Sequence, residues 1–261
     1  MNQIEENTKF VFGESFKRYS KQEMDVFINF LEVRLKQNKI NKDIFKDKIC
    51  LDAGCGNGRG SILMAKSGAK KVVSYDLSER NIETVDRLKK EYDLNNIHTF
   101  QGSVLDIPFK DEYFDFVWCN GVLHHTKNPT KGLWEITRVL KEDCYMWLYL
   151  YGAGGVYWYV VDFIREYLKD ISQEEVLNTL VSLGYTPDKI AEFMDDWKVP
   201  VLEKYTIKNI EQVLMEKGLT FRKLNDGVNY DTSKRRLAFD EKEIMGDGDL
   251  RYLCRRKYCL V

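Results

Sequence analysis

Short apolar runs alternate with amphipathic segments through the middle of this chain. Apolar and β-branched or aromatic residues dominate the short runs, whereas the segments between them repeat apolar residues at helical spacing. The runs predict strands at residues 47–54, 70–76, 97–104, 114–122 and 145–152. Because strands that alternate with helices pair in parallel through right-handed crossovers, we expect an α/β fold of the Rossmann-like, doubly wound kind.

Helical periodicity fills the intervals and both flanks of this core. Helices are expected at residues 61–68, 78–92 and 128–141, with Ser78 as the N-cap of the second. The pattern at 23–35 is also helical, so the first 45 residues predict a helical cap.

The alternation is interrupted after the fifth strand and then resumes. Three aromatic-rich helices are expected within residues 155–200, followed by a helix at 207–218 and strands at 219–226 and 250–257. The last two strands suit an antiparallel pair at one edge, which gives a mostly parallel sheet of about seven strands. We expect one domain, residues 1–261, made of an N-terminal helical cap (1–45), a cofactor-binding core (46–151), a helical lid insertion (155–200) and a completion of the sheet (201–261).

Composition and charge do not favour a nucleic-acid-binding or membrane protein. The chain has 261 residues, with 40 basic against 41 acidic side chains, so its charge does not favour nucleic acid or an anionic membrane surface. The uncharged run at 144–161 is long enough for a membrane span, but its three glycines favour a strand, a turn and the start of a helix. The polar N-terminus shows no secretory signal, and we expect a cytoplasmic protein that is not bound to a membrane.

The cysteines and histidines do not predict a metal site. The six cysteines form no CxxC pair, and an unsecreted chain keeps its thiols reduced. Cys119 with His124 and His125 could suggest zinc, but the chain has only three histidines and no second pair at ligand spacing.

A glycine-rich loop follows the first predicted strand in the stretch CLDAGCGNGRG, residues 50–60. The dinucleotide fingerprint G-x-G-x-x-G fits no register here, because starts at Gly54, Gly56 or Gly58 do not place a glycine or alanine five residues later. An acid, Asp52, instead precedes the glycines. A carboxylate there would repel a pyrophosphate, whereas it suits a ligand with a positive amino group.

A second acid, Asp76, ends the second strand eighteen residues after Gly58. A carboxylate at this place can accept hydrogen bonds from both ribose hydroxyls of a nucleoside. A nucleoside with a positive charge and no phosphate is S-adenosylmethionine.

With these residues in place, the chain resembles the class I S-adenosylmethionine-dependent methyltransferases over residues 46–151. LDAGCGNGRG is similar to their first motif, SYDLSERNIE to their acidic loop and QGSVLDIPF to their adenine-side segment. The stretches FDFVWCNGVLHHT and LWEITRVLKEDCYMWLYL resemble the part that closes the pocket. The likeness is to the small-molecule branch that includes ubiquinone-biosynthesis-type enzymes. Two positions depart from the pattern, since Ser103 replaces an acid and Cys144 stands where the usual turn has glycine.

The resemblance implies S-adenosylmethionine as the cofactor and S-adenosylhomocysteine as the product. It places Asp52 and the glycine-loop backbone at the methionine end, Asp76 at the ribose, Leu77, Ser103 and Val104 at adenine, and Asn120 at the methionine tail. The expected cofactor-binding residues are Asp52, Gly54, Cys55, Gly56, Gly58, Asp76, Leu77, Ser103, Val104 and Asn120.

The acceptor side is less specific. His124 and His125 follow the fourth strand, where a histidine could take the proton that an alcohol or ammonium acceptor loses, with His125 preferred. The other interpretation is that this pair only shapes the loop. Both histidines are candidate catalytic residues.

Aromatic and arginine side chains supply the candidate substrate site, and core packing or a solvated loop is the alternative in each case. An aromatic wall follows the fifth strand, the N-terminal lead offers lid residues that include Phe16, and two arginines in the loop at 229–250 could grip a phosphate or carboxylate. The candidates are Arg18, Tyr19, Tyr151, Tyr157, Trp158, Tyr230, Arg235 and Arg236.

We therefore predict methyl transfer to oxygen or nitrogen of a small molecule such as a sugar, a nucleotide-linked sugar or an acidic metabolite. An RNA or protein methyltransferase is the alternative, which the even charge and the lack of an appended module do not favour. A cofactor-binding protein without catalysis is a third hypothesis. The sequence leaves the oligomeric state open, with a homodimer among the options.

Overall fold

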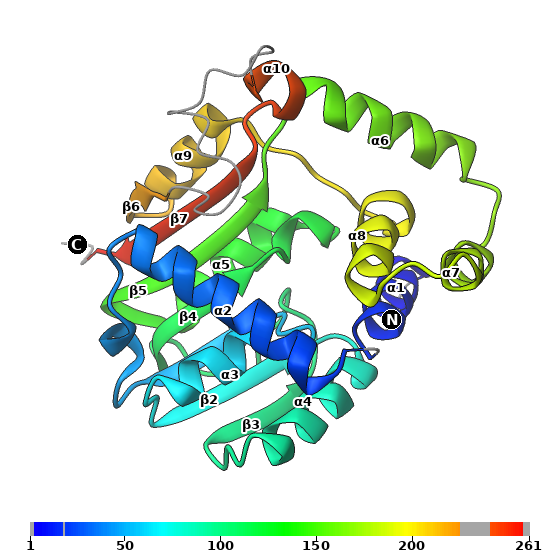
Figure 1. Cartoon of the computed structure of the whole chain (residues 1–261). Helices are drawn as coiled ribbons and strands as arrows, with labels where there is room; N and C mark the ends of the chain where they lie inside the picture. The colour runs from blue at the N-terminus through cyan, green and yellow to red at the C-terminus, as the bar shows by residue number, and fades with distance from the viewer. Residues whose placement is uncertain (1–2, 18, 225–240, 258–261) are drawn as a thin grey trace.

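A seven-stranded sheet forms the centre of the molecule, which is described here from a computed structural model (Figure 1). The structure describes residues 3–17, 19–224 and 241–257. The strand order is β3-β2-β1-β4-β5-β7-β6, in which β7 runs antiparallel to both of its neighbours and the other pairs are parallel. The strands are β1 (Ile49–Ala53), β2 (Lys71–Asp76), β3 (Ile97–Gln101), β4 (Phe114–Asn120), β5 (Leu140–Tyr151), β6 (Leu219–Lys223) and β7 (Asp249–Arg256). The predicted Rossmann-like fold with a mostly parallel sheet is confirmed.

Helices cover both faces of the sheet, as the alternating pattern predicted. The core helices are α3 (Arg59–Lys66), α4 (Glu79–Glu91), α5 (Pro129–Val139) and α9 (Ile207–Glu216). The remaining helices are α1 (Gln3–Phe16), α2 (Lys21–Gln37), α6 (Gly155–Tyr167), α7 (Gln173–Ser182), α8 (Pro187–Lys198) and α10 (Glu241–Met245), with short 3-10 turns η1 (Lys42–Phe45) and η2 (Leu123–His125). None of these described helices has the length and apolar character needed to cross a membrane.

Two apolar cores hold the layers together. One face of the sheet packs under α2, α3 and α4, where the rings of Trp118 and Trp147 stack with centroids 4.6 Å apart. The other face packs under α5 and α9 around residues such as Ile136 and Leu214. Burial of one such apolar side chain contributes about 1.5–3 kcal/mol to the free energy of folding. Because successive side chains of a strand point to opposite faces, each strand contributes to both cores.

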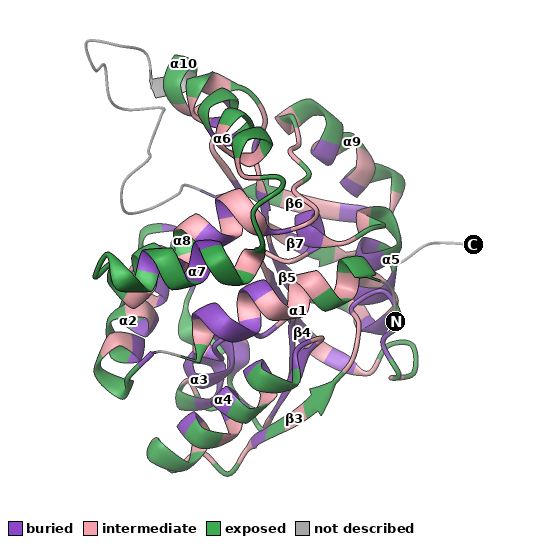
Figure 2. Ribbon diagram, turned by 90° about the vertical axis from the view of Figure 1, so that its right-hand side faces the viewer, coloured by how far each residue is buried: buried purple, intermediate pink, exposed green. Residues whose placement is uncertain are grey.

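The N-terminal helix and the inserted helices pack against each other above the carboxyl ends of the strands (Figures 1 and 2). Val11 of α1 is fully buried against Leu177 of α7 and Met194 of α8. At the other side of α1, Gly13 lies so close to α4 that a Cβ atom there would come within 2.7 Å of the Ser78 hydroxyl. These contacts bring α1 and α8 together over one cavity, although the two helices lie far apart in the sequence.

The start of β5 differs from the usual family turn, in which a glycine stands at the position of Cys144. The strand already starts at Leu140, and its pairing with β4 shifts register between Phe114 and Phe116. The left-handed backbone falls on Asp143, with φ of 57°, and Cys144 continues the strand. Aspartate adopts this conformation more readily than most residues. The chain therefore turns at Asp143 within an irregular strand and needs no glycine at position 144.

Candidate active site

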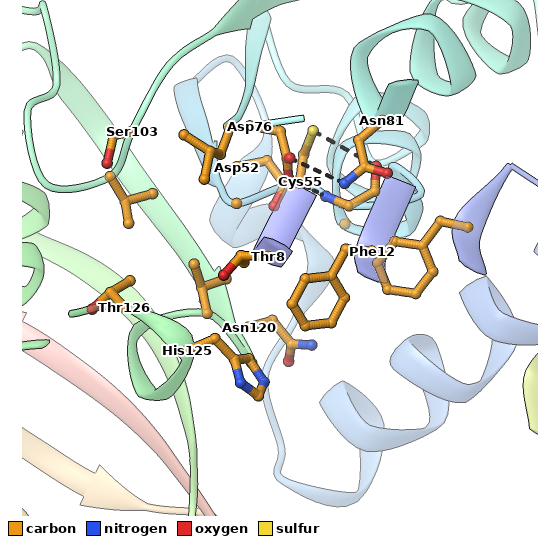
Figure 3. A pocket seen from close by; sticks show the side chains of 18 of the residues that line it. Thr8, Phe12, Asp52, Cys55, Asp76, Asn81, Ser103, Asn120, His125 and Thr126 are labelled. Atoms are coloured by element: carbon orange, nitrogen blue, oxygen red, sulfur yellow. Dashed lines mark hydrogen bonds between the residues drawn. The ribbon is translucent and has the colours of Figure 1, made fainter. Parts of the chain in front are cut away.

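The loops after β1, β2, β3 and β4 line one cavity at the carboxyl ends of the strands (Figure 3). Thr8, Phe12 and Phe16 of α1 cover it from one side, and Asp195 of α8 reaches it from the inserted helices. In a doubly wound sheet, ligands bind at this edge where the strand order reverses, which here is between β1 and β4.

The glycine loop uses its glycines for backbone conformation and for close packing. Gly54 and Gly56 have φ of 75° and 52° and line the cavity together with Cys55. A Cβ atom on Gly56 would lie 2.8 Å from the ring of Phe16, so α1 could not settle over a side chain there. Gly58 does not line the cavity, because the close approach that it permits is to Val85 of α4.

Asp52 presents a buried carboxyl group to the cavity. Its Oδ2 accepts a hydrogen bond of 2.6 Å from the Ser61 hydroxyl, which in turn lies 2.6 Å from the Ser74 hydroxyl. Burial raises the pKa of this carboxyl to about 7, because the charged form loses its hydration. A cation bound beside Asp52 would stabilise the carboxylate.

Asp76 is fixed by three donors at the end of β2. Its Oδ2 accepts from the Gly56 amide at 2.9 Å, and its Oδ1 accepts from the Ser78 amide at 2.8 Å and from Asn81 Nδ2 at 3.0 Å. Burial raises its pKa from the ordinary value. Ser78 does occupy the N-cap position of α4, but its side chain forms no capping hydrogen bond, and its backbone serves Asp76 instead.

The sequence analysis missed Asn81, which lines the cavity from the first turn of α4. Its Oδ1 is buried and has no hydrogen-bond partner among the residues that the structure describes. A buried carbonyl oxygen without a donor is costly, so a ligand hydroxyl or amine that reached Asn81 would be stabilised. The only sequence signal was its place, five residues after Asp76.

The other predicted cofactor residues also reach the cavity. Leu77, Ser103 and Val104 line the side near β2 and β3. The Ser103 hydroxyl accepts a hydrogen bond of 3.3 Å from the Leu105 amide, which fixes the loop after β3. Asn120 lines the other side at the end of β4, where its Oδ1 accepts from Trp147 Nε1 at 2.9 Å. The amide nitrogen of Asn120 is then the group left to donate.

The two histidines occupy different environments. His125 lines the cavity, with Nδ1 3.0 Å from the Val201 carbonyl oxygen and Nε2 3.0 Å from Asp195 Oδ1. His124 is fully buried and lies outside the cavity, where its ring stacks on Tyr151 at a centroid distance of 3.9 Å. Burial lowers the pKa of His124 well below the ordinary value, so that ring is neutral.

Asp195 connects this histidine to the aromatic wall, and the sequence analysis did not name it. Its Oδ2 accepts a hydrogen bond of 2.6 Å from the Tyr151 hydroxyl, and Tyr151 lines the cavity. Because a carbonyl only accepts, Nδ1 of His125 donates to Val201, and Asp195 Oδ1 faces Nε2 without forming a hydrogen bond there. The signal in the sequence was weak, since Asp195 and Asp196 are two of five charged residues in the segment 188–197.

Three further acceptor-site candidates that the structure describes do not line this cavity. Tyr157 donates its hydroxyl to Asp196, and Trp158 donates to the Gly152 carbonyl oxygen at 2.7 Å, so both hold the inserted helices in place. Tyr19 packs edge-on against Phe27 in the core under α2. Four further candidates lie outside the described residues: Arg18, Tyr230, Arg235 and Arg236.

Comparisons with known proteins agree with this architecture. A protein-family model described as "Methyltransferase domain" matches residues 51–148. The chain is 28% identical over 93 residues to the uncharacterized methyltransferase YcgJ of Bacillus subtilis, which is 36% of each chain. It is 30% identical over 92 residues to the 27-O-demethylrifamycin SV methyltransferase of Amycolatopsis mediterranei, covering 35% of this chain and 34% of that one. The matched segment thus spans about a third of each relative's length.

Two solved structures extend the likeness in fold to most of the chain. The crystal structure of Bacillus subtilis YcgJ has a TM-score of 0.57 at 14% identity and covers 88% of this chain and 99% of that one. The [4+2]-cyclase SpnF also has a TM-score of 0.57 at 14% identity, with 93% and 84% covered. At such identity these structures show the fold alone, and the cyclase illustrates that the fold does not fix the reaction.

The fold and the matched domain agree on the central part of the chain. Residues 51–148 match a methyltransferase domain, as the motifs resembling class I S-adenosylmethionine-dependent methyltransferases predicted. The methyl donor of this class is S-adenosylmethionine. Likeness to the ubiquinone-biosynthesis-type branch stays a prediction.

The cavity itself fits this cofactor. Two buried acids face the cavity near β1 and β2, which suits an ammonium group at Asp52 and ribose hydroxyls at Asp76. The unsatisfied Oδ1 of Asn81 supplies a further acceptor beside Asp76. A Cβ atom on Gly54 would clash with Val122 at 2.5 Å and one on Gly56 with Phe16, so these glycines let the cavity walls pack closely around the loop.

Proposed function

We propose that this protein transfers a methyl group from S-adenosylmethionine to an oxygen or nitrogen atom of a small molecule. The observation that carries the proposal is the cavity in which the acids of the cofactor motifs and the His125–Asp195 pair face the same space. An acceptor bound in this cavity would therefore lie between the cofactor and a group that can take its proton.

The cofactor supplies an already activated methyl group, so the protein mainly orients the acceptor and excludes water. Asp52, Asp76 and Asn120 would hold the methionine and ribose parts. Phe12 of α1 packs against the ring of His125 with centroids 5.1 Å apart, which closes the cavity between the cofactor loops and the histidine. A cover of this kind suits an acceptor of modest size.

We assign the acceptor's proton to the His125–Asp195 pair. The Val201 carbonyl oxygen orients the imidazole, and Asp195 lies beside Nε2, so the pair has room for one proton at the cavity wall. His124 is a poor candidate for this step, because it is enclosed behind His125. Proton acceptance by a placed side chain accelerates such reactions by about 10²–10⁴-fold.

The test is incubation of the purified chain with methyl-labelled S-adenosylmethionine and separated host pools of small metabolites, glycans, RNA and protein. We expect label in the small-metabolite or glycan pool, and mass analysis of that product identifies the acceptor and the methylated atom. Label in RNA or protein would overturn the small-molecule proposal. Cofactor binding without transfer to any pool would support a non-catalytic role.

A further inference from the structure

Arg59 is a positive side chain in the cavity that none of the steps above uses. It is the first residue of α3, directly after the glycine loop, and it lines the cavity. Within the described residues, its guanidinium forms no hydrogen bond, ion pair or ring contact, whereas Asp52 and Asp76 both have partners. Arg59 is therefore a partly buried donor group without an acceptor among the residues that the structure describes.

A second arginine, paired with its own carboxylate, lies behind the cavity wall. Tyr149, which also lines the cavity, carries the guanidinium of Arg251 over its ring at 4.1 Å. The nearby carboxylate, Asp249, is already committed, since it accepts from the Tyr149 hydroxyl at 2.8 Å and from Arg251 Nη2 at 2.7 Å. Arg251 is only 3% exposed, so this second cation lies behind Tyr149 without contact with solvent.

The groups around Arg59 act on its charge in both directions. Burial and the neighbouring Arg34 lower the pKa of Arg59, whereas Tyr19, Tyr149 and Asp52 raise it. Burial also lowers the pKa of Arg251, to about 9. Asp52 forms no ion pair with Arg59, so an anion that pairs with the planar guanidinium through two hydrogen bonds would offset the remaining cost of its partial burial.

We propose that Arg59 is the anion-binding residue of this cavity and pairs there with a carboxylate or phosphate group of a bound molecule. The inference rests on the proposed function, because it concerns the ligands of that same cavity. The anion has two possible sources, which share this chemistry: the carboxylate at the methionine end of the cofactor, or an acidic group on the acceptor. Recognition of an acid, which the sequence analysis placed on Arg235 and Arg236, is assigned here to Arg59.

The first arm of the test asks whether the anion belongs to the cofactor. The affinities of S-adenosylhomocysteine and of 5′-methylthioadenosine, which lacks the amino-acid part, are measured by calorimetry for the wild type and Arg59→Met. If Arg59 holds the cofactor carboxylate, the substitution weakens S-adenosylhomocysteine by at least about tenfold and leaves methylthioadenosine within about twofold.

The second arm asks whether the anion belongs to the acceptor. Inorganic phosphate and acetate are titrated separately into the S-adenosylhomocysteine complex, and amide chemical shifts of the cavity loops are followed. If the acceptor supplies the anion, one of these probes binds saturably to the wild-type complex, and Arg59→Met abolishes that response while cofactor affinity is unchanged.

Two further variants make the outcome decisive. Arg59→Lys keeps the charge and should retain part of either response, and Lys127→Met removes a cavity-rim cation that already pairs with Glu5 at 3.5 Å and should change neither. The proposal is overturned if the wild type binds S-adenosylhomocysteine and Arg59→Met, folded by its thermal transition, alters neither affinity nor anion response. A wild type that binds no S-adenosylhomocysteine would contradict the proposed function instead.

Discussion

Asp195 Oδ1 lies 3.0 Å from Nε2 of His125, which joins an inserted helix to the loop after β4. The same carboxylate accepts from the Tyr151 hydroxyl on β5, so three separate elements meet at one side chain. Under the proposed function, this contact joins the inserted helices to the side chain that accepts the proton of the acceptor.

Asp195→Asn should lower the rate of methyl transfer by roughly 10–100-fold, because an amide can still bond to Nε2 but cannot share a proton with it. Affinity for S-adenosylhomocysteine should stay within about threefold, since Asp195 lies away from the residues expected to hold the cofactor. The measurement is a steady-state rate with the acceptor identified by labelling, together with calorimetric binding.

Asp196→Asn is the matched control for Asp195, because it changes the neighbouring acid on the same helix, which bonds to Tyr157 and does not line the cavity. Its rate should stay within about threefold of the wild type. Equal losses in the two variants would mean that Asp195 acts only by holding the inserted helices.

Asp76→Ala should weaken S-adenosylhomocysteine by at least about tenfold, while His125→Ala should leave the affinity within about threefold. Asp76 both orders the Gly56 amide and offers its carboxylate to the ribose, whereas His125 lies on the acceptor side. Calorimetry on the two variants checks this, and an equal loss in both would contradict the division of roles.

Cofactor binding should release a proton from Asp52. The pKa of this carboxyl in the free protein is raised to about 7 by burial, and a bound ammonium group favours the ionised form, which lowers it. About half a proton should therefore leave per molecule bound at pH 7, and affinity should rise between pH 6 and pH 8.

Calorimetry in buffers of different ionisation enthalpy measures this release. Asp52→Asn should abolish the proton release that comes from Asp52. Burial also raises the pKa of Asp76, so a smaller release that remains in the variant would come from Asp76. A binding enthalpy of the wild type that does not depend on the buffer would refute the assignment.

Phe12→Ala should weaken S-adenosylhomocysteine by about tenfold and speed its release, because the ring covers the cavity beside Phe16 and His125. Phe10→Ala is the control, since Phe10 is also half-buried on α1 and packs against the inserted helices, but does not line the cavity. Stopped-flow measurement of the dissociation rate of S-adenosylhomocysteine compares the two variants. The same acceleration in Phe10→Ala would show a general loosening of α1.

The cofactor half of the site could be predicted because local sequence determines it. The glycine loop, Asp76 and the residues after β3 and β4 each follow a strand directly, and parallel strands place their carboxyl ends at one edge. Asp52, Leu77, Ser103, Val104 and Asn120 therefore reached one cavity as expected. Gly58 was placed less well, since the sequence does not tell whether a glycine faces a ligand or a neighbouring helix.

The acceptor half could not be predicted in the same way, because its residues come from elements that only packing brings together. Asp195 is about seventy residues from His125 in the sequence, and nothing in the helix pattern of α8 shows which side turns to the cavity. Tyr157 and Trp158 seemed suitable by type, yet the structure uses them to hold the inserted helices.

The sequence by itself determined the fold class, the order of the elements and the cofactor motifs, since periodicity and turn chemistry act over a few residues. Only the tertiary structure decided that α1 and α8 meet over the cavity and that His125 faces it while His124 does not. It also decided that Arg59 lies there with no hydrogen-bond or ion-pair partner in the described part of the chain. The physical reason is that these facts depend on burial and charge compensation between distant segments, which no local pattern encodes.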